Sequence, residues 1–141
     1  MTELKGDKNW ERIATYDIQT ENDIVLARQY IRFHAKQFGM GIVDQTRITT
    51  AVSELFRNMY QYAGGGKVNV DTGDYSGHHS LIITCIDHGP GIKDLEIAMN
   101  DGYSSGGGMG YGLPGAKRLV DEFKIESEID KGTKVRVVKW I

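Results

Sequence analysis

The stretch SLIITCIDHGPG, residues Ser80–Gly91, decides the fold. Its first part, Ser80–Ile86, is the most continuous apolar run of the chain and predicts a central strand. Asp87 follows the strand directly, and Gly89 and Gly91 then predict a turn. A carboxylate at the end of a central strand is well placed at the rim of a pocket. Asp87 is therefore either an acceptor for a ligand, such as an exocyclic amine, or a turn residue that bonds its own backbone.

Helices and strands are expected on both sides of this stretch. Apolar residues spaced three and four apart predict two helices, the first beginning after Thr20 and ending at Gly39, the second capped by Asp44 and ending at Gly64. Shorter helical segments are expected at Asp94–Met99 and from Leu113 to about Glu122. The other strands are expected at Arg12–Ile18, Lys67–Asp71, Phe123–Glu128 and Lys134–Lys139, with a polar turn at Thr72–His79.

This order of elements predicts an α/β (α+β) two-layer sandwich, with helices on one face of a mixed sheet. The chain has 141 residues, which fits a single domain. We expect that domain over residues 11–141, preceded by a flexible tail over residues 1–10.

Composition excludes several classes of protein. The chain is 40% hydrophobic and 26% charged, which is typical of a globular domain and not of a disordered chain. It contains no run of 18 apolar residues, so no membrane span is expected. A net charge of −2 argues against a general nucleic-acid binder. The one cysteine, Cys85, excludes a disulfide framework and fits a cytoplasmic protein.

Glycine is in excess, and the excess is local. Of 18 glycines, seven lie within Gly102–Gly115, a stretch that leads into the helix that Leu113 begins. Unhindered backbone N–H groups ahead of a helix can hold phosphates. The stretch is not a Walker loop, because no Gly-Lys-Ser/Thr sequence follows. A surface loop without a ligand remains the alternative interpretation.

Two further positions carry candidate chemistry. Glu54 and Asn58 are four residues apart on the second helix, so they share a face. A carboxylate one turn from an amide oxygen can supply a proton acceptor and a Mg²⁺ ligand, although a solvated helix face is the alternative. Thr133 follows Gly132 between the last two strands, where a plain hairpin turn is the alternative.

In their order and spacing, these motifs resemble the nucleotide-binding domain shared by DNA gyrase, Hsp90, histidine kinases and MutL, known as the GHKL or Bergerat fold. The motifs are Glu54–Asn58, Asp87–Gly91, Gly108–Gly112 and Gly132–Thr133. Other segments are similar to the small serine kinases of bacterial partner-switching systems, especially the stressosome switch kinases and, more distantly, the anti-sigma factor kinases. These segments are Val43–Leu55, Tyr60–Gly64, Asp101–Ser104, Gly112–Phe123 and Lys139–Trp140.

The resemblance implies a role for each motif. Asp87 would accept a hydrogen bond from the adenine amino group of ATP, with Thr133 in support. Asn58 would hold Mg²⁺ against the phosphates, and Glu54 would orient or deprotonate the attacking serine hydroxyl. The glycines would bring the backbone close to the nucleotide, at Gly89 and Gly91 beside the base and at Gly108, Gly110 and Gly112 around the phosphates. Arg57, Lys117 and Arg118 are candidate phosphate contacts, with solvated surface charges as the alternative.

The function implied by the resemblance is an ATP-dependent protein-serine kinase of a bacterial stressosome pathway. Its substrates would be STAS-domain scaffold or antagonist proteins of the RsbS and RsbR type. When released, it would activate a PP2C-type phosphatase of the RsbU type and switch on the general stress response, without nucleic acid or membrane as a partner. The alternatives are an anti-sigma factor kinase that sequesters a sigma factor, and a nucleotide-gated binding module without turnover.

Overall fold

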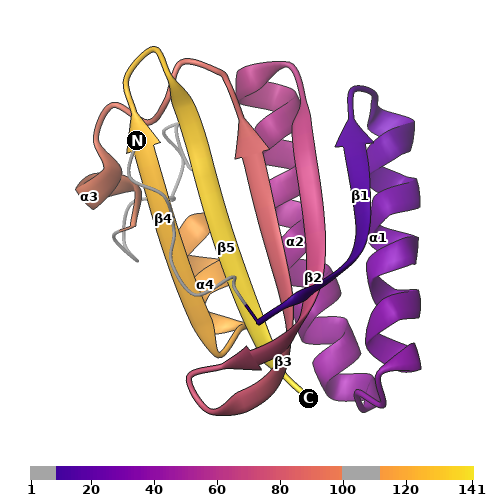
Figure 1. The fold of residues 1–141 in the computed structure, drawn as a ribbon. Coiled ribbons are helices and arrows are strands. Elements are labelled where there is room, and N and C mark those ends of the chain that lie inside the picture. The colour runs from indigo at the N-terminus through magenta and orange to yellow at the C-terminus, as the bar shows by residue number, and fades with distance from the viewer. Residues whose placement is uncertain (1–8, 100–111) are drawn as a thin grey trace.

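A computed structural model describes residues 9–99 and 112–141 of the chain, which form one sheet with helices beside it (Figure 1). The strands are β1 (Glu11–Ile18), β2 (Gly66–Tyr75), β3 (His78–Asp87), β4 (Glu122–Glu128) and β5 (Gly132–Trp140). The helices are α1 (Glu21–Gln37), α2 (Ile42–Ala63), α3 (Leu95–Ala98) and α4 (Leu113–Arg118). Of the predicted tail over residues 1–10, all but residues 9 and 10 lie outside the described residues.

The sheet has the order β1-β2-β3-β5-β4, and all four pairings are antiparallel. The prediction of a mixed sheet was therefore wrong. Helices α1 and α2 run in opposite directions, so the chain re-enters the sheet where β1 ended and β2 runs back along it (Figure 1). Strands β3 and β4 do point the same way, but β5 lies between them, so no parallel pair forms.

The hairpin of β2 and β3 is longer than expected, and its turn is shorter. The two strands pair as far as Tyr75 and His78, so the turn is only Ser76-Gly77 instead of Thr72–His79. Both turn residues have positive φ angles, 52° and 85°, as a tight two-residue hairpin turn requires. The ends of both strands are polar, so their sequence lacks the apolar alternation that would have predicted the longer strands. Ring stacking stabilises this end of the hairpin, where the ring centroids of His78 and Trp140 lie 3.7 Å apart.

The helix boundaries are partly as predicted. Thr20 caps α1 as expected, and the Asp23 side chain completes a capping box with it. Helix α2 begins two residues before the predicted cap, because Gly41 is its N-cap and Asp44 lies in the first turn. Helix α4 ends at Arg118 and not near Glu122. Just after it, Asp121 accepts hydrogen bonds from Lys139 Nζ and the Trp140 backbone N–H, both at 2.8 Å, which draws the chain into β4.

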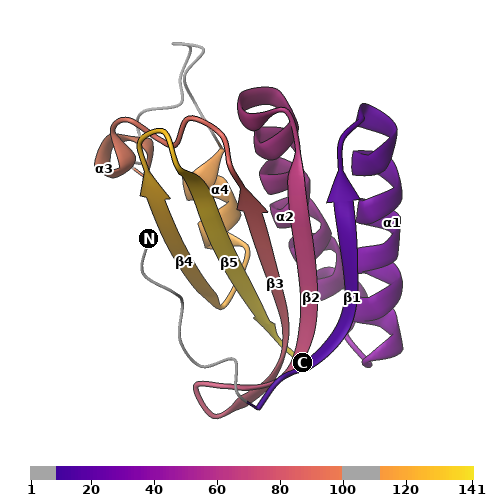
Figure 2. The ribbon, with the colours of Figure 1, turned by 45° about the horizontal axis from the view of Figure 1, so that its top comes forward.

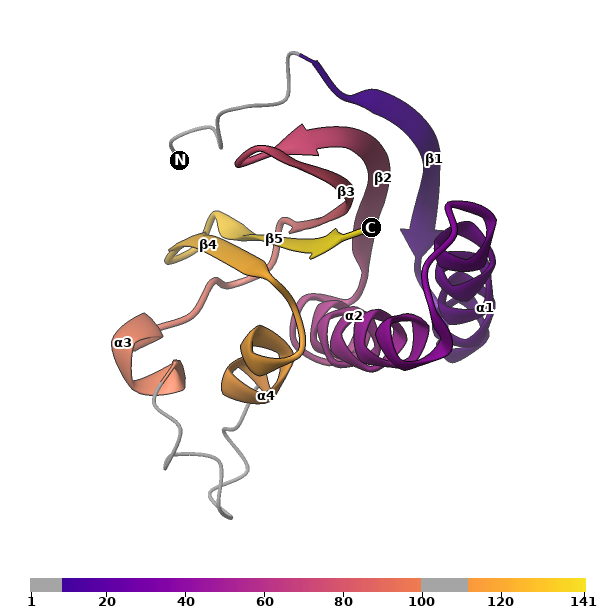
Figure 3. The same ribbon diagram turned by 90° about the horizontal axis from the view of Figure 1, so that it is seen from below.

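The core lies between the sheet and the helices, all of which stand on the same side of the sheet (Figures 2 and 3). Helix α2 is central in this layer and packs against α1, α4, β3 and β5. Its residues Ile48, Val52 and Leu55 are fully or almost fully buried, as their spacing predicted. Phe56 is fully buried as well, although it was not part of the predicted face. Each such side chain stabilises the fold by about 1.5–3 kcal/mol. Among residues 9–99 and 112–141, none of the helices combines the length and the hydrophobicity that a membrane span requires.

Candidate functional site

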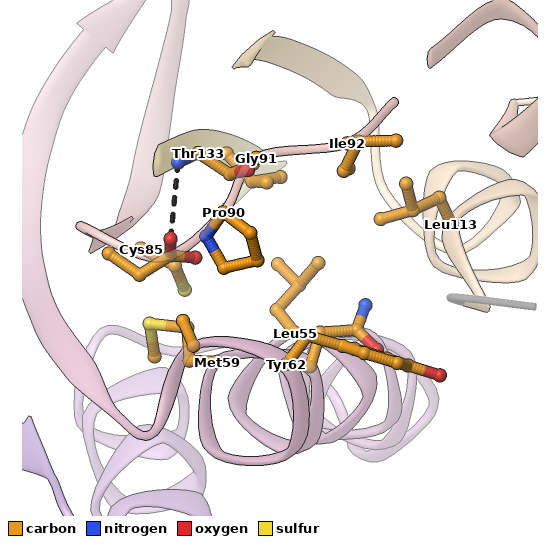
Figure 4. Close-up of a pocket in the computed structure, with 13 residues that line it drawn as sticks. Leu55, Met59, Tyr62, Cys85, Pro90, Gly91, Ile92, Leu113 and Thr133 are labelled. Atoms are coloured by element: carbon orange, nitrogen blue, oxygen red, sulfur yellow. Dashed lines mark hydrogen bonds between the residues drawn. The ribbon is translucent and has the colours of Figure 1, made fainter. Parts of the chain in front are cut away.

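A pocket of ≈ 460 Å³, partly open to solvent, lies between α2 and the carboxyl end of β3. In Figure 4, Leu55 points from α2 toward Pro90, which belongs to the turn after β3, and Met59 and Tyr62 lie on either side of Leu55 along the same helix. The rest of the lining comes from strand ends and loops: Asn58, Ala63, Cys85, Asp87, Gly91, Ile92, Leu113, Thr133 and Val135. Two mainly apolar walls facing one another suit a flat ring.

Asp87 is the acidic side chain of this lining, and its two oxygens are in different situations. Its Oδ1 accepts hydrogen bonds from the Gly89 N–H at 3.0 Å and the Thr133 N–H at 3.2 Å (dashed line in Figure 4). No donor from the described residues reaches Oδ2. Burial raises the pKa of Asp87, and the two backbone hydrogen bonds oppose that rise. The carboxylate is thus held in place by one oxygen, while the other is available to a ligand.

The turn after β3 packs tightly at two glycines. A Cβ at Gly89 would overlap the Ala63 side chain at the end of α2. Gly91 has a φ of +79°, and a Cβ there would overlap the Glu128 carbonyl. The predicted role of both glycines was close approach to a ligand, and the structure also shows protein contacts that exclude a side chain.

Thr133 is positioned by Ser127, a residue that belongs to none of the sequence motifs. The hydroxyl groups of Ser127 and Thr133 lie 2.8 Å apart, and Ser127 Oγ also accepts the Ile92 N–H at 2.8 Å. These contacts join β4, β5 and the pocket wall at Ile92. The pairing of Ser127 with Thr133 across β4 and β5 was not visible in the sequence, because it depends on the register of the hairpin.

Glu54 lies outside the pocket lining, one helical turn from Asn58. Its Oε1 accepts a hydrogen bond from Arg57 Nη1 at 2.9 Å, and the side chains of both residues are about half exposed. Its Oε2 lies against Gly112, where a Cβ would overlap it. The Glu54 carboxylate is therefore held on one side by Arg57 of its own helix and contacts Gly112, the residue before α4, on the other.

The predicted site residues are brought together only in part. Asn58, Asp87, Gly91 and Thr133 line the pocket, Gly89 lies beside it, and Glu54 and Gly112 touch one another next to it. Lys117 and Arg118 are exposed on α4 and are not part of the lining. Gly108 and Gly110 lie outside the described residues. Within residues 9–99 and 112–141, no three His, Cys, Asp or Glu side chains form a group that could hold a metal.

Residues 43–140 match the sequence profile of the histidine kinase-, DNA gyrase B- and HSP90-like ATPases. The chain belongs to this ATPase family. Among relatives, it is 51% identical to the serine/threonine-protein kinase RsbT of Bacillus subtilis, over 88% of this chain and 93% of that one. It is 31% identical to the anti-sigma F factor of a Thermoanaerobacter species, over 82% and 83% of the two chains.

A solved structure shows the same fold. The RsbU and RsbW domains of a Mycobacterium tuberculosis protein match with a TM-score of 0.62 and 20% identity, over 91% of this chain and 32% of that chain. The expected fold and family are thereby confirmed. As a member of this ATPase family with close similarity to RsbT, the chain is a partner-switching protein-serine/threonine kinase that uses ATP.

Gly112 provides a test of the contact with Glu54. Gly112→Ala places a side chain at a φ of +69° and against the Glu54 carboxylate. We expect it to destabilise the kinase by about 1–2 kcal/mol and to lower the phosphotransfer rate about tenfold or more. Gly115→Ala is the matched control, because Gly115 lies only three residues further on, in α4, and nothing lies within 4 Å of its Cβ position. That variant should be as active as the parent and as stable or more so. Equal effects of both changes in thermal melting and kinase assays would contradict this view.

Ser127 provides a test of the pocket wall. Ser127→Ala leaves the Ile92 N–H without its acceptor and the Thr133 hydroxyl without its partner. We expect a loss of stability of about 1–3 kcal/mol and a clear loss of ATP affinity, both measurable by melting with and without nucleotide. Ser127→Thr keeps the hydroxyl and should recover most of both. Unchanged ATP affinity in Ser127→Ala would show that Ser127 does not position the site.

Proposed function

We propose that the pocket binds ATP with its adenine ring between the apolar walls and its amino group on Asp87 Oδ2. Support comes from the lining: Leu55 of α2 faces Pro90 across the pocket (Figure 4), and Asp87, whose Oδ2 is not engaged, lines the same pocket. A carboxylate acceptor selects adenine over guanine, which presents a carbonyl group at the corresponding position. Thr133 supports this contact through its N–H bond to Oδ1.

The phosphates would then extend past Asn58 toward Glu54. Asn58 would hold Mg²⁺ with its side-chain oxygen, and phosphate oxygens and water would complete the coordination, as Mg²⁺ prefers. The bound Mg²⁺ would neutralise charge on the phosphates during transfer. Backbone N–H groups of Gly108, Gly110 and Gly112 would wrap the phosphates. Lys117 and Arg118 are proposed as further phosphate contacts, whereas Arg57 already bonds the Glu54 carboxylate.

Glu54 would act as the general base in transfer to serine. It takes the proton of the serine hydroxyl as that oxygen bonds to the γ-phosphorus. The bond from phosphorus to the β,γ-bridging oxygen breaks, and ADP leaves with that electron pair. The observation that carries this proposal is that one helix, α2, presents Asn58 to the pocket and Glu54 one turn away, in contact with Gly112. A single rigid element thus sets the distance between metal ligand and base.

The partners follow from the similarity to RsbT. We propose that residues 11–141 act as a single kinase domain in the cytoplasm, where a free buried thiol such as Cys85 stays reduced. The substrates would be STAS-domain scaffold or antagonist proteins of a stressosome. After release from them, the kinase would bind and activate a PP2C-type phosphatase and switch on the general stress response.

The direct test of this function is phosphorylation of a cognate STAS-domain protein with ATP and Mg²⁺, read out as phosphoserine by mass spectrometry. We expect one serine to be modified, no modification after Mg²⁺ is removed with EDTA, and activation of a PP2C-type phosphatase by the free kinase. If the STAS-domain protein carries no phosphoserine, and Glu54→Ala is indistinguishable from the parent, the proposal is wrong.

The similarity to anti-sigma F factors supports a second candidate, a kinase that chiefly sequesters a sigma factor. Affinity purification from the host separates the two functions. A sigma factor should co-purify in the second case, and a phosphatase or scaffold protein in the first. The higher identity to RsbT favours the first.

A further inference from the structure

The side chain of Lys139 is buried, although a lysine usually reaches solvent. Lys139 lies near the end of β5, is only 6% exposed, and does not line the nucleotide pocket. Its Nζ contacts two carboxylates, Asp121 Oδ2 at 2.8 Å and Asp44 Oδ1 at 3.3 Å. We call these three residues the Lys139 cluster. The buried ammonium group fixes the positions of both carboxylates, because an unpaired charge inside the protein is costly.

The two carboxylates belong to different parts of the fold. Asp44 lies in the first turn of α2, and Asp121 follows the end of α4. Asp121 has two further bonds to β5: its backbone N–H donates to the Val138 carbonyl at 2.9 Å, and its carboxylate accepts the Trp140 N–H at 2.8 Å. The Lys139 cluster therefore joins the beginning of α2 to the end of α4.

Helices α2 and α4 also contact one another at the candidate site. Glu54 Oε2 of α2 lies against Gly112, the residue before α4, and Leu113 of α4 is buried where the two helices pack together (Figure 3). The helices thus run in opposite directions, with the Glu54 contact at one end of α4 and the Lys139 cluster at the other. The ten residues of α2 from Asp44 to Glu54 span about 15 Å.

Helix α4 takes its position from these contacts at its two ends. It has only six residues, and a helix this short is not stable through its own hydrogen bonds. Without the Lys139 cluster, the end of α4 is no longer tied to α2, and Gly112 can shift against the Glu54 carboxylate. A displacement of about 1 Å at a reacting group can slow a reaction about 10²-fold.

We propose that the Lys139 cluster positions Glu54 for phosphoryl transfer, because it joins α4 to α2 and so sets how Gly112 meets the Glu54 carboxylate. The inference rests on the proposed function, because it concerns the geometry of the proposed general base. Its three residues are positioning residues, since they act on the reaction through Glu54. The contacts of Asp87 come from the turn after β3 and from β5, so binding of the adenine ring does not depend on the cluster.

The test is a kinetic comparison of Asp44→Asn and Lys139→Met with the parent chain, using ATP, Mg²⁺ and a cognate STAS-domain protein. We expect kcat per ATP-binding molecule to fall about five- to tenfold, with ATP affinity and KM for the protein within about twofold. The Asp44 side chain is 38% exposed, so Asp44→Asn should fold even if Lys139→Met, which leaves two carboxylates unpaired, does not. Asp44→Glu keeps the carboxylate and should recover most of the rate.

Combination with Glu54→Gln distinguishes positioning from a structural role. If the cluster acts through Glu54, Asp44→Asn should slow the Glu54→Gln variant by less than about twofold in single-turnover transfer. A cluster that only stabilises the fold would lower the melting temperature and leave kcat per ATP-binding molecule unchanged.

Arg47→Gln is the matched control. Arg47 is the other partner of Asp44, at 3.6 Å and half exposed, so this change removes a charge beside Asp44 without touching Lys139. It should leave kcat unchanged. An unchanged kcat in Asp44→Asn, in a reaction that the parent catalyses, would overturn the role of the cluster and leave the proposed function standing. An equal loss in Arg47→Gln, or a full further loss in Glu54→Gln, would do the same. Absence of phosphoserine with the parent chain would overturn both proposals.

Discussion

Glu54→Gln is expected to slow phosphoryl transfer to serine by about 10²- to 10⁴-fold, because an amide of the same shape cannot take the hydroxyl proton. ATP affinity should change by no more than about threefold, since Glu54 lies outside the lining of the nucleotide pocket. The ion pair with Arg57 is half exposed and contributes about 0–1 kcal/mol, so the variant should fold normally. Single-turnover transfer from labelled ATP measures the effect.

The control for this variant is ATP binding and thermal melting of the same preparation. Both should match the parent. If Glu54→Gln binds ATP normally and still transfers phosphate at more than about a tenth of the parent rate, Glu54 is not the general base and transfer proceeds by positioning alone.

Asp87→Asn is expected to weaken ATP binding by about 10- to 100-fold, the cost of one buried polar contact of about 1–3 kcal/mol. The side-chain oxygen of Asn can still accept from Gly89 and Thr133, but its NH₂ group would then face the adenine amino group, so two donors would meet. The preference for ATP over GTP should fall as well. Titration of both nucleotides measures this, and an unchanged preference would contradict the role of Asp87 in selecting adenine.

The same variant should not be less stable in the absence of nucleotide. Burial raises the pKa of Asp87, so ionisation costs more in the folded than in the unfolded chain. Protonated Asp87 therefore stabilises the folded chain. This contribution is complete below the pKa that Asp87 has in the unfolded chain, roughly 3.9, and it is lost as the pH rises through the higher pKa of the folded chain. Because Asn does not ionise, Asp87→Asn avoids this loss of stability, and its melting temperature at pH 7 should equal or exceed that of the parent. The advantage should vanish below about pH 4. A lower melting temperature at pH 7 would contradict this reasoning.

Much of the fold could be predicted from local pattern. The apolar spacing of α1 and α2 and the Thr20 cap are local features, and the structure follows them. The direction of the strands depends on which strands become neighbours, and the insertion of β5 between β3 and β4 left no trace in local sequence. The end of α4 depends on Asp121 contacting Lys139 and Trp140, residues far along the chain.

The polar part of the site was also predictable, because motif spacing names the side chains. Asp87, Asn58 and Thr133 do meet at one pocket. The apolar walls were not predicted, since residues such as Met59 and Tyr62 read as ordinary core positions of a helix. Ser127 and the contact between Glu54 and Gly112 were missed because both bring together residues from different elements.

A crystal structure of the kinase with a non-hydrolysable ATP analogue and Mg²⁺ would show directly how the pocket holds the nucleotide. We predict that the adenine amino group lies about 3 Å from Asp87 Oδ2, that Mg²⁺ is bound by Asn58, and that the γ-phosphate faces Glu54. An analogue bound away from Asp87, or with its phosphates turned from Asn58 and Glu54, would show that the site does not work as proposed.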